Sequence, residues 1–243
     1  MDADLLRTAR DLAAVINQRV HLHIPSVLAE GEVFALRISV TAADGLPVDN
    51  FPHTFRFEDS RGVEGLPPTF QLERGAGTAR IDGLRACGPD VALVCAQIET
   101  PRTPWINAGL VSNPAWVFRA PPYRVFWGDL HVHTRFSNCH AWRCLDPEWC
   151  NQYAREVALL DFVAPADHLR GIASDTARWP RLQELARRCN QPREFVTFLA
   201  FESSHAQGFG GDNNVYFADD DAPHFWLERD DMRGYAPKVH LQQ

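Results

Sequence analysis

The sequence predicts two domains: an all-β, immunoglobulin-like β-sandwich over residues 1–120 and an α/β sheet or barrel over residues 121–243. Three observations predict this division. Short alternating apolar runs between glycine and proline turns fill the first half, as in a β-sandwich. Strand-like and helix-like runs alternate in the second half, as in an α/β fold. Pro121 and Pro122, between the halves, form a stiff pair that cannot continue a central strand.

The first domain opens with a run of helical spacing. Leu5, Ala9 and Ile16 belong to an apolar face that predicts an amphipathic helix over residues 4–18. A short alternating segment, VHLHI at residues 20–24, then carries a first His-x-His pair. Proline follows this segment at once, and no acidic or histidine-bearing strand end lies nearby. Two outward histidines on an edge strand are therefore the favoured interpretation.

Residues 33 to about 118 have the pattern of β-strands. Phe34, Leu36, Ile38 and Val40 alternate with small or polar residues, which predicts a half-buried strand. No catalytic constellation occurs in this stretch. A scaffold role is therefore expected for the first domain, and ligand binding by its loops is the alternative.

The second domain alternates between predicted strands and predicted helices. Asp146, Pro147 and Glu148 mark a helix start, with an N-cap, a proline in the first helical position and an acid in the first turn. The predicted elements in order are a strand at 123–127, a helix from Asp146, a strand at 161–166, a helix from Pro180, a strand at 195–201 and a strand at 214–217.

Three successive apolar runs each end in residues that bind metals. The first run is followed by His131 and His133, the second by Asp167 and His168, and the third by Glu202. The carboxyl ends of parallel strands gather at one edge of a sheet. Buried strands do not end in such polar side chains unless these find partners. Each residue alone is more often a cap or a solvated side chain, but together they predict a metal cluster.

Histidine and carboxylate ligands suit divalent Zn, Mn or Fe ions. Two or three such ions about 3.5–4 Å apart would activate a water and bind a phosphoryl or acyl group, with Glu202 as the bridge. Asp129 and Asp167 are expected to orient the adjacent histidines. Arg135 and Arg170 follow the ligand runs and are expected to pair with a substrate anion, a solvated role being the alternative. Glu202, Asp167, Arg135 and Arg170 are thus the expected catalytic residues.

Charge and hydropathy limit the partners. The net charge is −7, without a basic block, which argues against nucleic acid as the main partner. No apolar run approaches the roughly 18 residues of a membrane span. The first residues, MDAD, carry acids where a signal peptide carries bases. The sequence therefore predicts a cytoplasmic protein with no membrane partner. The expected metal cluster adds a small-molecule substrate, a phosphoester or another anionic molecule.

Three of the six cysteines, Cys139, Cys144 and Cys150, lie close to the second His-x-His pair in the sequence. A zinc site built from these three is an alternative, but their spacing does not match a zinc knuckle. Reduced thiols are the favoured interpretation.

Three segments resemble a known family. GDLHVHTRFS, DFVAPADH and FESSHAQGFGGDNNVYF are similar, in this order, to the first three motifs of the PHP (polymerase and histidinol phosphatase) superfamily. The closest resemblance is to a branch described only as a domain of unknown function, with a β-rich N-terminal region. The resemblance implies a distorted (β/α) barrel and phosphoesterase-type hydrolysis. It makes His131 and His133 ligands of one ion, His168 a ligand of another and Glu202 the bridge.

The chain departs from the superfamily pattern at three places. Asn138 stands where the superfamily often has Asp, which leaves a weaker ligand. Asp212, after Gly211, stands where a Gly-His motif is usual and is the expected substitute ligand. The late Asp-x-His or Asn-x-His motif is not found, and the residues after the boundary are fewer than the roughly 200 of a full barrel. We therefore expect a partial barrel, from a fragment or a shortened member.

The function predicted from these features is metal-dependent hydrolysis of a phosphoester by a metal-activated water. A catalytically inert metal- or ligand-binding protein with a degenerate barrel is the alternative. A sandwich-based binding module with a vestigial PHP tail is a third possibility. Metal content distinguishes the three.

Overall fold

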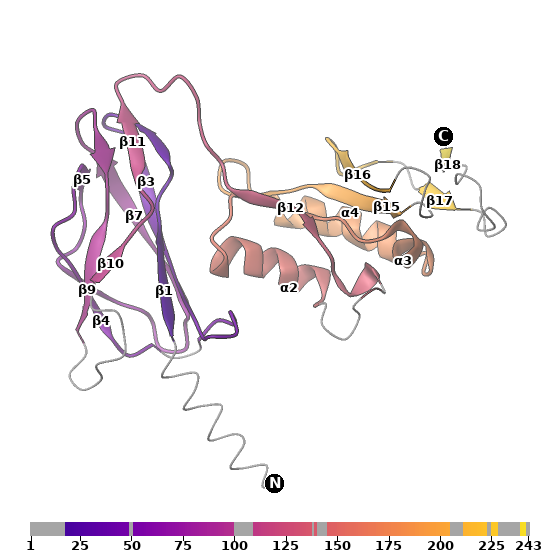
Figure 1. Ribbon diagram of the computed structural model, residues 1–243, viewed down its shortest axis with the longest axis horizontal. Coiled ribbons are helices and arrows are strands. Elements are labelled where there is room, and N and C mark those ends of the chain that lie inside the picture. The colour runs from indigo at the N-terminus through magenta and orange to yellow at the C-terminus, as the bar shows by residue number, and fades with distance from the viewer. Residues whose placement is uncertain are drawn as a thin grey trace, which may run out of the picture. The chain divides into compact units, whose positions relative to one another are not determined.

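The structure is a computed structural model (Figure 1). It describes residues 18–48, 51–99, 109–137, 139, 145–204, 211–222, 225–227 and 239–241. The predicted N-terminal helix lies outside these residues except for its last residue, and Asn138 lies outside them as well. None of the helices in the described part of the chain has the length and apolar content that crossing a bilayer requires.

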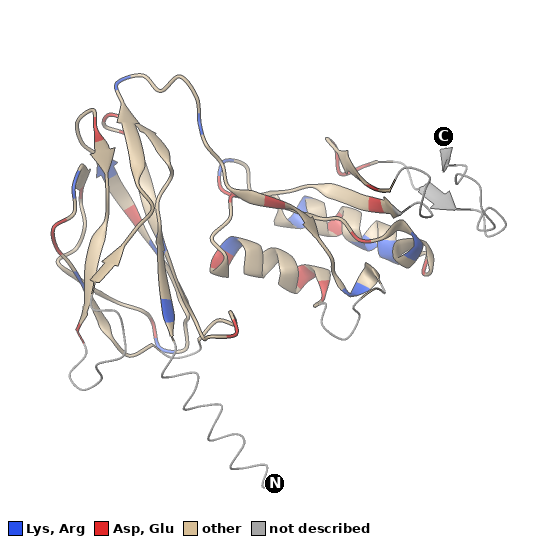
Figure 2. Cartoon of the chain, in the orientation of Figure 1, with Lys and Arg blue, Asp and Glu red and all other residues tan. Residues whose placement is uncertain are grey.

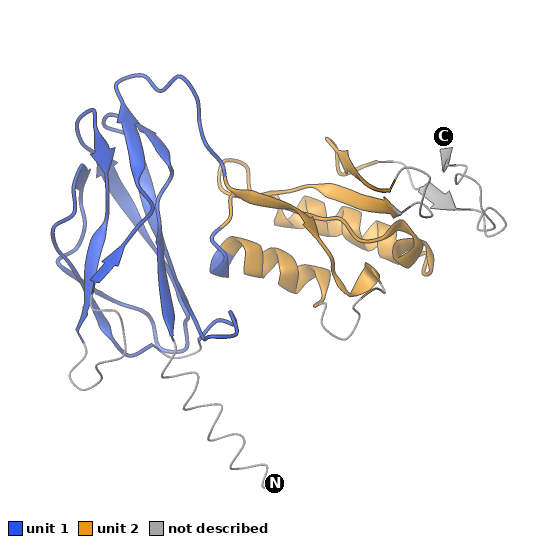
Figure 3. Ribbon diagram, viewed as in Figure 1, with its two compact units in different colours: residues 1–126, 156–159 blue, residues 127–155, 160–243 orange. Residues whose placement is uncertain are grey.

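The chain divides into two compact units (Figure 3). Unit 1 consists of Met1–Phe126 with Glu156–Leu159, and unit 2 consists of Trp127–Arg155 with Leu160–Gln243. The main division falls a few residues after the double proline of the predicted boundary. Basic and acidic residues are interspersed over the described parts of both units (Figure 2). This distribution differs from the basic stripe that is typical of nucleic-acid-binding surfaces.

The described part of unit 1 contains three sheets. The first consists, in spatial order, of β1 (Arg19–His23), β3 (Val33–Thr41), β7 (Thr78–Ala86) and β5 (Val63–Glu64). The second consists of β10 (Gly109–Val111), β9 (Cys95–Glu99), β4 (Thr54–Phe57) and β6 (Thr69–Gln71). The third consists of β2 (Val27–Ala29), β11 (Ala115–Phe118) and β8 (Val91–Ala92).

The two four-stranded sheets of unit 1 share one hydrophobic core. In β3, Leu36, Ile38 and Val40 are fully buried, so the strand predicted from their alternation is confirmed. Phe55 from β4 and Ile98 from β9 belong to the same buried cluster. Burying each such side chain contributes about 1.5–3 kcal/mol to the stability of the fold. The alternating apolar residues of the strand therefore stabilise its position against the core.

Unit 2 contains shorter sheets and its own helices. β12 (Gly128–Val132), β13 (Phe162–Pro165) and β14 (Val196–Thr197) form a parallel sheet. β15 (Leu199–Ser204) pairs antiparallel with β16 (Asp212–Phe217), as does β17 (Phe225–Leu227) with β18 (Val239–Leu241). The helices are the 3-10 helix η1 (Arg135–Ser137), α2 (Pro147–Gln152) with the π-helical turn η2 (Tyr153–Val157), α3 (Leu169–Ala173) and α4 (Arg178–Cys189).

The predicted fold class, an N-terminal β-sandwich followed by a partial, distorted (β/α) barrel of PHP type, is wrong. Of the described residues, 43% lie in strands and 17% in helices. A (β/α) barrel closes one parallel sheet whose strands each lead into a helix. The reason for the difference lies in the third predicted strand, residues 195–201. Its start, β14, pairs in parallel with β13, but its end enters β15, which pairs antiparallel with β16 instead of leading into a helix.

Helix α3 approaches η1 closely at a glycine. A Cβ at Gly171 would meet the backbone of Phe136 and Ser137. We expect Gly171→Ala to destabilise the protein by about 1–3 kcal/mol, because rigid backbone cannot move aside as a side chain can. Denaturant unfolding measures this loss. Gly109→Ala is the control, because a Cβ there meets nothing within 4 Å, and an equal loss in both variants would contradict the prediction.

Candidate metal centre

Strand β12 carries the predicted His-x-His pair to the edge of the parallel sheet. A Cβ at Gly128 would meet the ring of Phe162, so the glycine lets β12 approach β13 closely where the two strands begin to pair. The Asp129 carboxylate accepts a hydrogen bond from the backbone N–H of His131 (2.9 Å), so this contact is with the backbone of the histidine. The side chain of His131 is 45% exposed and that of His133 is 24% exposed, so solvent reaches both rings.

The Glu202 carboxylate lies at the centre of the cluster. It belongs to β15 and is only 2% exposed. Its Oε2 lies 2.7 Å from His133 Nε2, 3.2 Å from His131 Nε2 and 3.1 Å from His168 Nδ1. A parallel bridge joins His168 to Glu202, and the Glu202 N–H donates to the Asp167 carbonyl (2.9 Å). The fold thus brings together the three histidines and the glutamate that the sequence singled out.

Three of these atoms lie close enough together to compete for hydrogen bonds. His131 Nε2 and His133 Nε2 lie 3.0 Å from each other, and both face Glu202 Oε2. A neutral imidazole nitrogen either donates or accepts. If both rings donate to an ionised Glu202, their two N–H groups lie close to each other. If one Nε2 instead accepts from the other Nε2, the lone pair of the accepting nitrogen faces the negative carboxylate.

A shared cation would satisfy all three atoms at once. Metal–nitrogen bonds of about 2.0–2.1 Å place tetrahedral ligands about 3.3 Å apart. The observed separations of 2.7–3.2 Å are slightly shorter, so a small opening of the cluster would admit an ion. Two imidazoles and a carboxylate form a donor set that suits Zn, Mn or Fe. The residues therefore fit the metal that the sequence predicts.

Asp167 lies behind the cluster and organises the loop after β12. It is fully buried, and its carboxylate accepts hydrogen bonds from the Thr134 N–H (2.6 Å), the Thr134 hydroxyl (2.7 Å) and the Ser137 hydroxyl (2.7 Å). The Ser137 hydroxyl oxygen in turn accepts from the His168 N–H (3.1 Å). Asp167 is thus a positioning residue. Its contacts hold the backbone at Thr134, directly after His133, and they hold the Ser137 hydroxyl that contacts the backbone of His168.

Arg135 is engaged away from the cluster. Its guanidinium lies 2.8 Å from the Asp146 carboxylate. Asp146 also caps α2, since it accepts from the Glu148 N–H (3.3 Å), which confirms the predicted helix start, and it pairs with Arg181 at 2.8 Å. A cavity of about 250 Å³ beside Arg135 is also lined by Arg178 and Arg181, and all three guanidiniums already have acidic partners.

Arg170, the other predicted anion-binding residue, lies on α3. It is exposed, and within the part of the chain that the structure describes it makes no ion pair or hydrogen bond through its side chain. Arg170 lies on the helix that begins directly after His168. Of the two predicted arginines, it is the one whose charge has no local partner in these residues.

The pairing of Asp146 predicts a pH dependence of stability. Partial burial acts to raise the pKa of Asp146, but hydrogen bonding with Glu148 and the charges of Arg181 and Arg135 outweigh it and lower the pKa. The ionised form therefore stabilises the fold, and this contribution is complete above the ordinary Asp pKa of about 3.9 and is lost as the pH falls through the lower folded value. We expect Asp146→Asn to destabilise the protein at neutral pH, and the difference from wild type to shrink in acid. Unfolding by denaturant at both pH values tests this, and a constant difference would contradict it.

The strand β16 contributes a residue that sequence analysis missed. Asn214 stands directly opposite Glu202, so the two side chains share one face of the strand pair. Its Oδ1 is buried and has no hydrogen-bond partner among the described residues. Leaving such an oxygen unpaired costs about 1–3 kcal/mol, which an ion or a substrate donor at the site would offset. Asp212, the predicted ligand, shares this face opposite Ser204 but is exposed, and alternation from Asp212 could have identified Asn214.

The other His-x-His pair, in β1, has sheet partners. His23 Nδ1 lies 2.9 Å from the Arg37 guanidinium, and His21 Nε2 lies 3.5 Å from the Thr41 hydroxyl. Burial, and to a lesser extent the charge of Arg19, lowers the pKa of His21 and so favours its neutral form. β1 is an edge strand of its sheet, as predicted for this pair. The two His-x-His pairs therefore differ in their partners, and only the one at β12 faces a buried carboxylate.

No family model matches the chain, and no curated protein matches it. The chemistry of the site is therefore inferred from the residues themselves. At the site, three imidazoles surround the buried carboxylate of Glu202, and solvent reaches the site from the side of His131.

Proposed function

We propose that the protein is a metal-dependent hydrolase that holds a divalent ion through His131, His133 and Glu202 and acts on a phosphoester. The observation that carries the proposal is the convergence of their two Nε2 atoms and one carboxylate oxygen within 3.2 Å of one another. A divalent cation at this point would be bound by both nitrogens and the carboxylate oxygen at once. The similarity of the three motifs to the PHP superfamily supports the choice of a phosphoester. The proposal does not require a barrel.

The residues of the cluster have separable tasks. A divalent ion bound there would polarise a phosphoryl oxygen and lower the pKa of a water. Glu202 is held in place by the bridge between its backbone and that of His168, and its burial keeps water from competing for the carboxylate. His131, the most exposed ring, faces solvent on the side from which a substrate can approach. His168 Nδ1 contacts the same carboxylate oxygen and can hold a proton next to it.

Asn214 and Arg170 offer further polar groups to the ion and to a substrate. The buried Asn214 oxygen lies on the face of the strand pair that carries Glu202 and can bind the ion there. The exposed Arg170 guanidinium can pair with a phosphate oxygen. The expected compartment, the cytoplasm, and the expected small anionic substrate remain part of this proposal.

Metal binding without catalysis is a second candidate, and one observation favours it. The guanidinium of Arg135, which was expected to bind the substrate anion, is paired with Asp146 instead. A site with fewer cationic groups binds a phosphoester less tightly, because charge-assisted hydrogen bonds are the strong ones.

Hydrolysis of p-nitrophenyl phosphate and bis-p-nitrophenyl phosphate tests the proposal. Protein loaded with Mn²⁺ is expected to release p-nitrophenol from one of them, and Glu202→Gln is expected to abolish this release. Glu184→Gln is the matched control, because Glu184 is 65% exposed on α4 and, among the residues that the structure describes, pairs with a neighbouring arginine of that helix. Bound metal with no turnover of either probe would support the second candidate, and equal rates in both variants would contradict the proposed site.

A further inference from the structure

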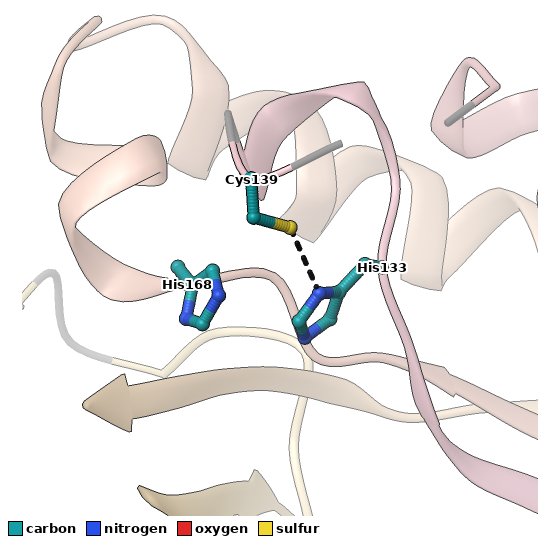
Figure 4. A group of neighbouring side chains, drawn as sticks. All are labelled: His133, Cys139 and His168. Atoms are coloured by element: carbon teal, nitrogen blue, oxygen red, sulfur yellow. Dashed lines mark hydrogen bonds between the residues drawn. The ribbon is translucent and has the colours of Figure 1, made fainter. Parts of the chain in front are cut away.

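Cys139 lies beside the metal centre and takes part in a second group of donor atoms. Its Sγ lies 3.2 Å from His133 Nδ1, and ligand atoms of His133, Cys139 and His168 all lie within 4.8 Å of one another. In Figure 4 the three side chains point toward one another, from the segment after β12 and from the start of α3. Cys139 is exposed, so an ion can reach this group from solvent.

The ring of His133 stands between the two groups. Its Nε2 faces Glu202 Oε2 at 2.7 Å, and its Nδ1 faces Cys139 Sγ at 3.2 Å. The two groups therefore use opposite nitrogens of one imidazole. The partner of a metal-bound histidine is usually a carboxylate, a carbonyl or water, so a thiol in this place needs an explanation.

We propose that His133, Cys139 and His168 form a second metal position, which takes a thiophilic divalent ion such as Zn²⁺ or Cd²⁺. Two imidazoles and one thiolate leave a fourth tetrahedral position open to water, as in catalytic zinc sites that have both cysteine and histidine ligands. Soft thiolate ligands select such ions over Mn²⁺. The only proton that leaves on binding is that of the thiol, and it goes to solvent.

The second position competes with the first for His133. A neutral imidazole has one nitrogen lone pair that can bind a metal. An ion bound to Nε2 therefore leaves a proton on Nδ1, and an ion bound to Nδ1 leaves a proton on Nε2. The chain accordingly binds one ion at a time through this ring. A hard ion such as Mn²⁺ occupies the position that contains Glu202, and a thiophilic ion occupies the position that contains Cys139. This inference shares His133 with the proposed function but does not require hydrolysis.

Titration of the full chain with Co²⁺ tests the second position, because a cobalt–thiolate bond adds a charge-transfer absorption in the near ultraviolet. We expect this absorption in the wild type, its loss in Cys139→Ser, and its displacement by Zn²⁺. Cys150→Ser is the matched control, because Cys150 lies in α2 of the same unit and forms part of the alternative three-cysteine site. The absorption is expected to persist in this control.

Three outcomes would overturn the inference: no charge-transfer absorption in the wild type, an unchanged absorption in Cys139→Ser, or a loss in Cys150→Ser as well. Glu202→Gln separates this test from that of the proposed function. It is expected to retain the cobalt–thiolate absorption while losing Mn²⁺ binding. Loss of both signals in Glu202→Gln, with the protein still folded, would contradict the existence of two separate positions.

Discussion

Replacing Glu202 by glutamine is expected to lower the affinity for Mn²⁺ by more than about 100-fold, because changes outside the ligand shell already cost about 10–100-fold. Glu202 Oε2 contacts all three histidines, so its charge is the common element of the site. Glutamine keeps the shape but removes the negative charge. Equilibrium dialysis against Mn²⁺ measures the affinity.

A fold defect could mimic this result, because Glu202 is buried. His131→Ala is therefore measured in parallel, since that side chain is 45% exposed and its removal leaves the core intact. It is expected to lose Mn²⁺ affinity as well. His21→Ala is the control, because His21 belongs to the other His-x-His pair, where it contacts Thr41. Equal affinities of His131→Ala and His21→Ala would contradict the assignment.

Replacing Asp167 by alanine is expected to destabilise the protein by about 3 kcal/mol or more, because each buried donor left unpaired costs about 1–3 kcal/mol. The carboxylate accepts from the N–H and hydroxyl of Thr134 and from the hydroxyl of Ser137, and alanine leaves all three donors without this acceptor. The loss is measured as a change in the denaturant midpoint of unfolding.

Asp175→Ala is the comparison for Asp167→Ala, because Asp175 is 55% exposed at its side chain. Its loss is expected to be much smaller, since solvent screens exposed carboxylates and can replace their hydrogen bonds. If Asp167 acted mainly in catalysis, Asp167→Ala would lose activity with little loss of stability. That result would contradict the positioning role given to it here.

The ligand cluster was predictable from strand order. His133 and His168 follow neighbouring strands, and β12 and β13 pair in parallel, so their carboxyl ends meet at one edge. Glu202 joins these histidines because the chain continues past β14 along the same edge, where the backbone of Glu202 forms a β-bridge with that of His168. The grouping of these side chains does not depend on a closed barrel.

The partners of the loop and strand residues were not predictable, because they depend on register and on loop path. Asn214 faces the site only because β16 pairs with β15 so that it lies opposite Glu202, and a shift of one residue would turn it to the other face. Cys139 contacts His133 because the short helix η1 turns the chain back after β12. Arg135 has a suitable position in the sequence, but the cap of α2 provides its partner.

The barrel was wrong because helical spacing and strand spacing are local signals, whereas barrel closure depends on long-range pairing. The third apolar run was interpreted as one strand, but it divides into β14 and β15, which pair with different strands. An apolar run does not contain the information that selects a parallel or an antiparallel neighbour.

The central claim is that His131, His133 and Glu202 hold a divalent ion. Its most direct test is elemental analysis of the purified chain after dialysis against Mn²⁺ or Zn²⁺ at neutral pH, followed by removal of free metal. We expect the wild type and His21→Ala to retain an ion in proportion to the protein, and His131→Ala to retain far less Mn²⁺. A wild-type chain that retains neither metal would contradict the claim.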